Sequence, residues 1–177
     1  NIRATWFDIS RFWTDYLARC SAMLQAGRHV ADVCCFLGEG APSLVPQREY
    51  NRPAIPKEFD YDACNREVLL TATVKDGRIH LPSGANYAVL TLPPDMRFMT
   101  PSLLAHIQDL VRDGATVLGP RPEYSPSLYD HENADAQVAA MAEDLWGASR
   151  EKAGEHVFGR GRVIWGKSVE EALASAN

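Results

Sequence analysis

The chain has 177 residues, of which 46% are hydrophobic and 23% charged, and it carries a formal net charge of −5 at pH 7. This length suits one domain that buries roughly 70% of the surface its unfolded chain would expose. The negative charge argues against a nucleic-acid partner, because phosphate binding needs a concentrated basic face. No apolar run approaches the roughly 20 residues of a membrane span.

The first predicted element is an amphipathic helix over residues 5–27. Thr5 is its expected N-cap, Asp8 lies in the first turn, and Gly27 ends the helix. Apolar residues recur at three- and four-residue spacing and form one stripe: Ile9, Phe12, Trp13, Tyr16, Leu17, Cys20, Met23 and Leu24. The stripe predicts a helix that packs on the core, or one that docks on something outside this chain.

A short buried strand is predicted next, over residues 29–37, ending at Gly38-Glu39-Gly40. Residues 41–58 contain four of the eleven prolines and show almost no periodicity, which predicts a functional or disordered loop. Residues 60–70 then resume a helical pattern. Asp60 or Asp62 is the expected cap of that helix.

The remaining chain alternates strands with helices. Asp76-Gly77 predicts a hairpin turn, and Thr100 followed by Pro101 predicts a helix start. Further strands are expected at 86–94, 115–120 and 161–166, and helices at 100–114, 135–147 and 168–176. This alternation indicates an α/β fold, a three-layer parallel sheet with helices on both faces, of the class I glutamine-amidotransferase-like or flavodoxin-like kind, with a small β-hairpin insertion.

Two groups of polar residues are candidates for a site. Glu39 follows the first strand, and open parallel sheets bind ligands beyond the carboxyl ends of their strands. Strand ends also often carry polar turn residues, so Glu39 can be a solvated turn instead. Asp60, Tyr61 and Asp62 suit sugar hydroxyls or a hard cation such as calcium, but acids at a helix start are also explained by capping alone.

The cysteines predict no catalytic or metal role. Cys20, Cys34, Cys35 and Cys64 form no C-x-x-C pair, and we expect small core residues, with Cys34 and Cys35 on opposite faces of a strand. No serine lies in G-x-S-x-G, and no cysteine lies on a glycine-flanked elbow. Without a nucleophile, the predicted fold serves as a scaffold.

Long stretches of the sequence resemble one enzyme family, glycoside hydrolase family 106, the bacterial α-L-rhamnosidases that degrade plant glycosides and polysaccharides. The stretches that carry the resemblance are "TWFDISRFWTDYLARCSAMLQAGRHVADVCCFLGEGAP", "FDYDACNREVLL", "VKDGRIHLPSGANYAVLTLP", "MTPSLLAHIQDLVRDGATVLGPRPEYSPSL" and "GRGRVIWG". They cover nearly the whole chain.

The resemblance implies a piece of a much longer enzyme. A catalytic (β/α)8 barrel would precede the chain and β-rich domains would follow it, with residues 1–28 as a connecting helix and 29–177 as the amidotransferase-like domain. The start at Asn1, without Met or a signal-peptide pattern, also suggests a processed protein or a piece, and leaves the compartment open.

The family's chemistry is inverting hydrolysis of a rhamnose-containing carbohydrate, with calcium in the full-length enzyme. Both catalytic carboxyl groups would lie upstream of this chain, so no catalytic residue is assigned here and the isolated chain is expected to be inactive. Glu39, Asp60, Tyr61 and Asp62 become candidates for the substrate rim, in a wall that should be exposed in the isolated chain.

Two other hypotheses about the function of the chain stay open. One is a stand-alone scaffold or homo-oligomerisation domain whose aromatic helix face mediates a dimer. The other is a free-standing amidotransferase-like or flavodoxin-like enzyme, which bound flavin or a fast-reacting cysteine would reveal.

Overall fold

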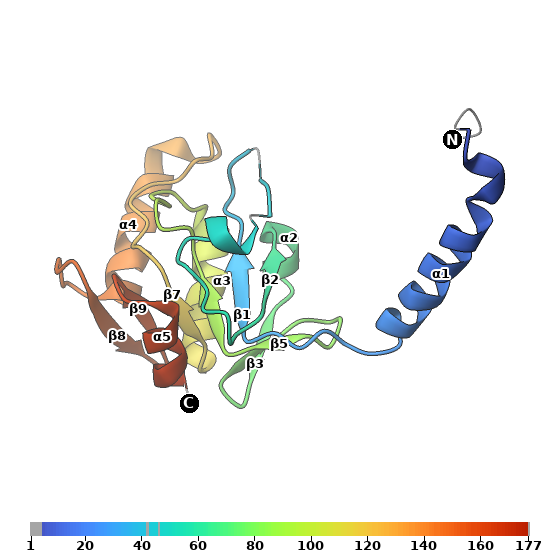
Figure 1. The fold of residues 1–177 in the computed structure, drawn as a ribbon. Coiled ribbons are helices and arrows are strands. Elements are labelled where there is room, and N and C mark those ends of the chain that lie inside the picture. Colours follow the sequence, from blue (N-terminus) through green and yellow to red (C-terminus); the bar gives the residue numbers. More distant parts are fainter. Residues whose placement is uncertain (1–4, 42, 46, 177) are drawn as a thin grey trace.

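The computed structural model describes residues 5–41, 43–45 and 47–176, and its centre is a six-stranded sheet (Figure 1). The strand order is β2-β1-β6-β7-β9-β8; the first five pair in parallel, and β8 pairs antiparallel with β9. The bounds are β1 (Val33–Phe36), β2 (Tyr61–Cys64), β6 (Val89–Thr91), β7 (Thr116–Leu118), β8 (Gly154–Phe158) and β9 (Gly161–Trp165).

Helices cover both faces of this sheet. One buried cluster joins α3 (Pro101–Asp113) and α4 (His131–Trp146) to Phe36, Leu90 and Val117 of the strands. A second cluster, on the other face, joins α5 (Val169–Ala176) to Val33 and Ile164. The predicted α/β fold, a mostly parallel sheet between helical layers, is confirmed.

Strand β1 is buried on both faces, which explains its continuous apolar sequence. Val33 and Cys35 belong to the cluster under α5, whereas Cys34 and Phe36 belong to the cluster under α3 and α4. Cys34, Cys35 and Cys64 are buried, as expected, on alternating sides of their strands, while Cys20 is partly exposed.

The strand order reverses beside β1. The chain moves from β1 outward to β2 and then returns to the other side of β1 with β6, before continuing to β7 and β9. Such a reversal opens a crevice outside the carboxyl ends of the two strands involved. Gly38 follows β1, and Pro93 follows β6. A Cβ built on Gly38 would lie 3.8 Å from the side chain of Pro93. The residues after β1 therefore lie at this crevice.

Local signals set the ends of two helices. Thr100 precedes Pro101 at the start of α3, and Gly114 ends α3 with a φ of 123°, as predicted. At α5, the backbone N–H of Ser168 donates to the Glu171 carboxylate at 2.7 Å, and the Glu171 N–H donates to the Ser168 hydroxyl at 3.2 Å. The two bonds form a reciprocal capping box, and hydrogen bonds from the Ser168 backbone N–H and side chain to the carboxylate lower the pKa of Glu171 because they favour its ionised form.

The helix predicted over residues 60–70 is wrong for its first half. Residues Tyr61–Cys64 form the edge strand β2, and only Arg66–Leu69 are helical, as α2. Asn65 caps α2, since its side chain accepts from the Val68 N–H at 3.0 Å. Neither Asp60 nor Asp62 is a cap. Pairing with β1 decides the conformation here, since a helical pattern this short has little stability of its own.

Two strands differ from the sequence prediction. The segment predicted as one strand over 86–94 contains β5 (Asn86–Tyr87) and β6, because Tyr87 pairs with Ile79 in a second sheet while Val89 pairs with Val33. The sequence predicts no strand at β8. This strand is the half-exposed edge of the large sheet, and its sequence, GEHVF, has too few apolar residues to show a strand pattern.

The predicted hairpin is confirmed as β3 (Thr73–Lys75) and β4 (Arg78–His80), which form a three-stranded sheet with β5. Asp76 and Gly77 both have positive φ, 52° and 74°, as a two-residue hairpin turn of type I′ requires.

Replacing Gly77 by Ala should lower the free energy of unfolding by about 1 kcal/mol. A Cβ on Gly77 would meet nothing within 4 Å, so the cost is conformational strain alone. Urea denaturation of Gly77→Ala measures it. Asp76→Gly is the matched control and should change stability by less than about 0.5 kcal/mol, because it removes a Cβ at positive φ. Equal effects of the two variants would contradict this explanation.

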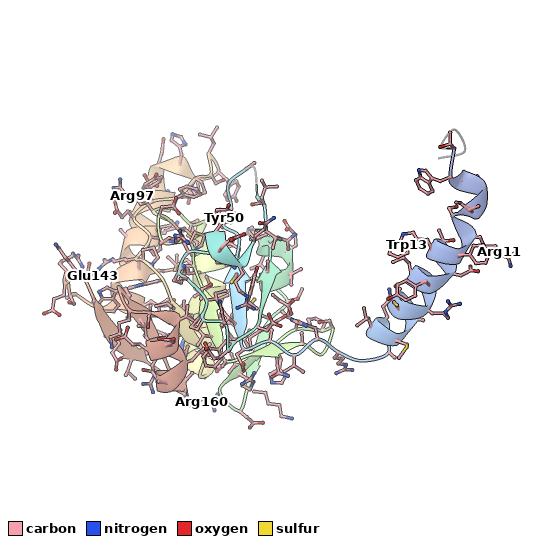
Figure 2. The ribbon with its side chains drawn as sticks, in the orientation of Figure 1. Arg11, Trp13, Tyr50, Arg97, Glu143 and Arg160 are labelled. Carbon is pink, nitrogen blue, oxygen red and sulfur yellow. The ribbon has the colours of Figure 1, made fainter. Side chains whose placement is uncertain are left out.

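The amino-terminal segment contains a short 3-10 helix, η1 (Phe7–Ile9), and the helix α1 (Arg11–Gln25). Ser10, not Thr5, is the N-cap residue of α1, and Asp8 lies in η1 rather than in the first turn. No residue of α1 is buried, and the helix stands apart from the sheet (Figure 1). Phe12 is 81% exposed and Trp13 58% exposed, and Figure 2 shows Trp13 and Arg11 on different sides of a helix that projects from the sheet. The expectation that the apolar stripe packs on this chain's core is wrong.

In the part of the chain that the structure describes, no helix is long and apolar enough to cross a membrane.

Candidate functional site

Glu39 lies at the crevice beside β1 with both carboxylate oxygens occupied. Oε2 accepts from the Thr100 backbone N–H at 2.6 Å, and Oε1 accepts from the Thr100 hydroxyl at 2.7 Å. The Arg66 Nε lies 2.9 Å from Oε1. The Glu39 side chain is only 5% exposed, so the expectation of an exposed residue is wrong. One carboxylate therefore joins the end of β1 to the starts of α2 and α3.

The position of Glu39 follows from the charge distribution of a helix. The first N–H groups of α3 have no partners within the helix, and the amino end of a helix attracts negative charge. The Thr100 hydroxyl is used on Glu39 instead of capping its own helix. Arg66 completes the network, and its Nη2 donates to the Ser102 hydroxyl at 3.0 Å. Glu39 thus caps α3 from another part of the chain.

A polar cavity of about 460 Å³ opens over this network. Its walls come from the residues after β1, from the start of α2, from the start of α3 and from the segment after β7; the lining residues are Gly38, Glu39, Gly40, Ser43, Asn65, Arg66, Glu67, Thr100, Pro126 and Ser127. Hydroxyl, amide and guanidinium groups of this kind suit a polyhydroxylated ligand such as a sugar. We call this cavity the Glu39 cavity.

The other predicted site residues lie at the opposite end of the parallel strands, where β1 and β2 begin. Tyr61 begins β2 and pairs with Val33, the first residue of β1, so Asp60 is level with Asp32. Seven residues separate Asp32 from Glu39 along the chain, which is on the order of 20 Å of extended backbone. The structure does not bring Glu39 together with Asp60, Tyr61 and Asp62.

The two aspartates at this end already have partners. Asp60 lies 2.7 Å from Arg48 Nη2, and Asp62 accepts from the Tyr87 hydroxyl at 3.0 Å. His29 Nε2 is 3.9 Å from a carboxylate oxygen of each aspartate. Burial and the bond to Asp62 raise the pKa of the Tyr87 phenol, so Tyr87 stays a proton donor.

Arg48, which the sequence analysis did not single out, organises the loop between β1 and β2. It lies in the short 3-10 helix η2 (Arg48–Tyr50). Its Nη1 donates to the carbonyls of Pro56 at 3.0 Å and Phe59 at 2.8 Å, and its guanidinium lies 5.2 Å from the centre of the Tyr61 ring. The proline-rich loop is therefore tied to β2 at this end. No sequence motif marks Arg48, because two of its partners are backbone carbonyls, which every residue carries.

The residues that the structure describes contain no group of three or more His, Cys, Asp or Glu side chains that could hold a metal ion. Asp60 and Asp62 do not fit a calcium site in this arrangement, because Arg48 occupies the first and Tyr87 the second. Calcium prefers six to eight oxygen ligands, and these two carboxylates do not converge on a shared position with others.

The buried cysteines should be chemically inert. The Cys34 Sγ lies 3.3 Å from the Cys64 Sγ, and this hydrogen bond, together with burial, raises the pKa of Cys34 far above 9.0. Burial raises the pKa of Cys35 as well. The thiolate is the reactive form of cysteine, so a raised pKa and restricted access in the core both lower the reactivity of Cys34 and Cys35.

Iodoacetamide at pH 8 should therefore label Cys20 alone in the folded protein. Mass spectrometry after digestion measures the labelled sites, and labelling in 6 M guanidinium, where all four cysteines should react, is the control. Rapid labelling of Cys34 or Cys35 in the folded chain would contradict this expectation and support the hypothesis of an enzyme with a reactive cysteine.

The comparisons with known proteins agree with this architecture. The profile of glycoside hydrolase family 106, described as alpha-L-rhamnosidase, matches residues 1–177. The solved structure of a rhamnosidase from Novosphingobium sp. PP1Y superposes with a TM-score of 0.77 at 33% identity, over 97% of this chain and 16% of that chain. A Formosa agariphila protein with the provisional name beta-glucuronidase is 40% identical over 144 residues, which is 81% of this chain and 12% of that protein.

The fold and the matches identify an α/β domain of a kind that occurs in a glycoside hydrolase family. More narrowly, the chain belongs to glycoside hydrolase family 106, the α-L-rhamnosidase family. It spans about one sixth or less of the length of the relatives it matches.

Proposed function

We propose that this chain is an accessory domain of an inverting α-L-rhamnosidase that removes terminal α-L-rhamnose from plant glycosides or polysaccharides. One observation carries the proposal: 97% of the chain superposes on a rhamnosidase structure, yet it accounts for only 16% of that protein. The remainder of such an enzyme has ample room for a catalytic barrel and β-rich domains.

The catalytic acid and base belong, in this proposal, to a preceding (β/α)8 barrel. An inverting enzyme needs two carboxyl groups roughly 6.5–9.5 Å apart, one to protonate the leaving group and one to activate water. Glu39 is not suited to either task, because Thr100 and Arg66 bind both of its oxygens. Calcium, if the full-length enzyme holds it, would be bound outside this chain, since Asp60 and Asp62 are paired with Arg48 and Tyr87.

The proposed role of this domain is to dock on the barrel and complete the rim of the barrel's active site. Docking would use the exposed apolar face of α1, where Phe12 is 81% and Leu24 also 81% exposed. The Glu39 cavity would form the rim, with Arg66 and Ser43 as the side chains nearest to a sugar. Glu39 would hold that rim in shape rather than react.

The order of the five parallel strands supports a flavodoxin-like fold. Numbered along the chain, β2-β1-β6-β7-β9 reads 2-1-3-4-5, which is the order of flavodoxin-like doubly wound sheets. We infer that this domain is a relative of that fold, or of the amidotransferase-like folds, used without its own nucleophile.

Release of p-nitrophenol from its α-L-rhamnoside tests the proposal. The full-length protein should hydrolyse this substrate, and the isolated 177-residue chain should not. Activity of the isolated chain would overturn the accessory role. p-Nitrophenyl β-glucuronide is the second substrate, chosen because of the provisional name of the Formosa relative; a full-length protein that cleaves only the glucuronide would overturn the rhamnosidase assignment.

A second candidate function is homo-oligomerisation through the same helix. Trp13 and Tyr16 stack with ring centres 5.6 Å apart and remain half-exposed, so two copies of α1 could bury them against each other. Light scattering of the isolated chain at 10 and 100 μM separates the candidates. A stable dimer that persists in the full-length enzyme favours oligomerisation, and a monomer favours docking on the barrel.

A further inference from the structure

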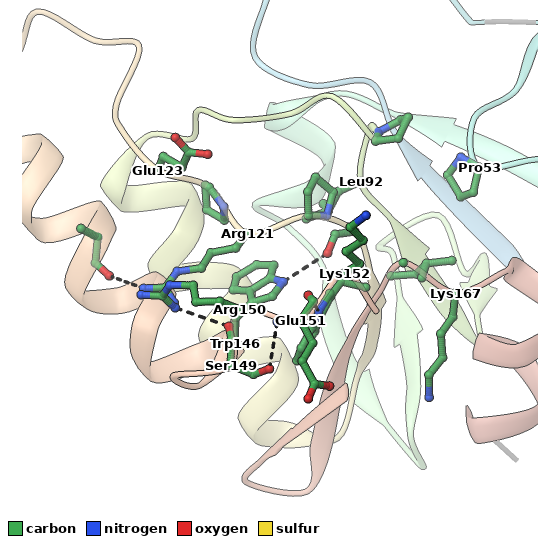
Figure 3. Close-up of a pocket in the computed structure, with 18 residues that line it drawn as sticks. Pro53, Leu92, Arg121, Glu123, Trp146, Ser149, Arg150, Glu151, Lys152 and Lys167 are labelled. Carbon is green, nitrogen blue, oxygen red and sulfur yellow. Dashed lines mark hydrogen bonds between the residues drawn. The ribbon is translucent and has the colours of Figure 1, made fainter. Parts of the chain in front are cut away.

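A second and larger cavity, of about 690 Å³, lies beyond the carboxyl ends of β6, β7 and β9 (Figure 3). Leu92 follows β6, Gly119 follows β7 and Gly166 follows β9, so three neighbouring strands deliver residues to it. None of the residues predicted to form a site lines this cavity. Its volume lies within the range of small-ligand sites, which is roughly 300–1,000 Å³.

One part of the cavity wall is apolar and rigid. Trp146 is 2% exposed and its indole N–H donates to the Gly119 carbonyl at 3.1 Å, while the Trp165 indole N–H donates to the Glu151 carbonyl at 3.0 Å. Prolines 53, 94, 120 and 122 also line the cavity. Trp146 is part of the core beneath the cavity, whereas Trp165 is partly exposed, so Trp165 and the prolines are the rings that offer flat C–H and π surfaces to the apolar face of a ligand.

The polar part of the wall has an excess of positive charge. It carries Arg121, Arg150, Lys152 and Lys167 against Glu123 and Glu151. Glu123 is bound from outside the cavity by Arg97, whose hydrogen bonds hold the pKa of Glu123 below its usual value. This local excess is notable in a chain whose net charge is −5.

Two of these cations remain available for a ligand. Arg121 donates to the carbonyls of Ala139, in the middle of α4, and of Gly147, just after it. Lys167 pairs with Glu155 at 2.9 Å, so Arg121 and Lys167 both have a structural use. Among the described residues, the Arg150 guanidinium donates only to the neighbouring carbonyls of Ala148 and Ser149, each at 3.4 Å, and it has no acidic partner.

Lys152 makes no hydrogen bond or ion pair with the residues that the structure describes. Figure 3 shows Lys152 extending toward Leu92 while the Glu151 carboxylate points the other way. Lys152 and Arg150 sit on the loop between α4 and β8, beside the ring-lined wall.

We propose that this cavity binds an acidic saccharide, a sugar unit with a carboxylate or sulfate group. The sugar ring packs on Trp165 and the prolines, and the anionic group lies between Lys152 and Arg150. The choice of a saccharide rests on the proposed function, since a domain of a glycoside hydrolase meets glycan chains. The cavity would then hold an acidic part of a polymer whose rhamnose is cleaved elsewhere.

Isothermal titration calorimetry on the 177-residue chain tests this proposal without any measurement of rhamnosidase activity. The probes are trigalacturonate for the carboxylate arm, glucose 6-sulfate for the sulfate arm, and L-rhamnose and inorganic sulfate as neutral and sugar-free comparisons. We expect binding of at least one acidic saccharide, no measurable binding of rhamnose, and weaker binding at higher salt, because ionic attraction is screened.

Lys152→Ala and Arg150→Ala should each weaken that binding about 10-fold, the usual effect of removing one charge-assisted contact. Arg160→Ala is the matched control and should leave binding unchanged, since Arg160 is an exposed arginine before β9, at the other end of the strand that leads to Lys167. No binding of either acidic saccharide, equally strong binding of inorganic sulfate, or binding that survives both substitutions would overturn the proposal. The proposed function would stand in each of these cases.

Discussion

Glu39→Ala should lower the free energy of unfolding by about 3 kcal/mol. The substitution leaves the Arg66 guanidinium and the Thr100 N–H without their shared acceptor in a site where Glu39 is only 5% exposed. Removing one member of a buried pair costs more than the pair itself contributes, because the remaining charge stays desolvated. We take the lower end of the usual range, since Arg66 is 35% exposed.

Chemical denaturation followed by circular dichroism measures this effect, and Glu67→Ala provides the control. Glu67 lines the same cavity but is exposed, so its removal should change stability by less than about 0.5 kcal/mol. Glu39→Gln keeps one acceptor oxygen and should fall between the two. An effect of Glu39→Ala no larger than that of Glu67→Ala would contradict the capping role and return Glu39 to the candidates for direct ligand contact.

Removal of the apolar face of α1 should leave the stability of the isolated chain unchanged but reduce the activity of the proposed full-length enzyme. Phe12→Asp combined with Leu24→Asp should leave the melting temperature of the 177-residue chain within about 1 °C, because no residue of α1 is buried. In the full-length enzyme the same pair should reduce activity at least 10-fold. Burying side chains of this size contributes roughly 1.5–3 kcal/mol each, and two charges in the interface would remove that gain.

Arg11→Ala with Arg19→Ala is the comparison for the helix, since it changes exposed polar residues of α1. It should leave both the melting temperature and the full-length activity nearly unchanged. A fall in the melting temperature of the isolated chain on changing Phe12 and Leu24 would show that α1 packs on this domain after all. Unchanged full-length activity would contradict docking on the barrel.

The fold was predictable from the sequence where local signals and burial agree. The continuous apolar run around Cys34 and Cys35 predicts a strand covered on both faces, and Thr100, Pro101 and Gly114 mark the ends of α3. The prediction failed where tertiary pairing decides. Tyr61–Cys64 adopts strand structure because β1 offers it a parallel edge, and this edge is not visible in the sequence around Asp60.

The candidate site was predictable in position but not in chemistry. The end of β1 places Glu39 at the point where the strand order reverses, as expected from parallel sheets in general. Its partners come from residues 66 and 100, and sequence spacing gives no measure of such distant contacts. The grouping of Glu39 with Asp60 and Asp62 failed for the same reason, since one residue follows β1 and the others lie at the start of β2.

The contacts of Arg48 give the loop between β1 and β2 a particular kind of instability. Its guanidinium holds Pro56, Phe59 and Asp60 at once, so loss of this one side chain frees several attachments together. The loop and the edge strand β2 would then open as one unit, while β1 keeps its pairing with β6 on its other side. Amide exchange in residues 47–64 would speed up together, and this edge of the domain would become the first point of attack for a protease.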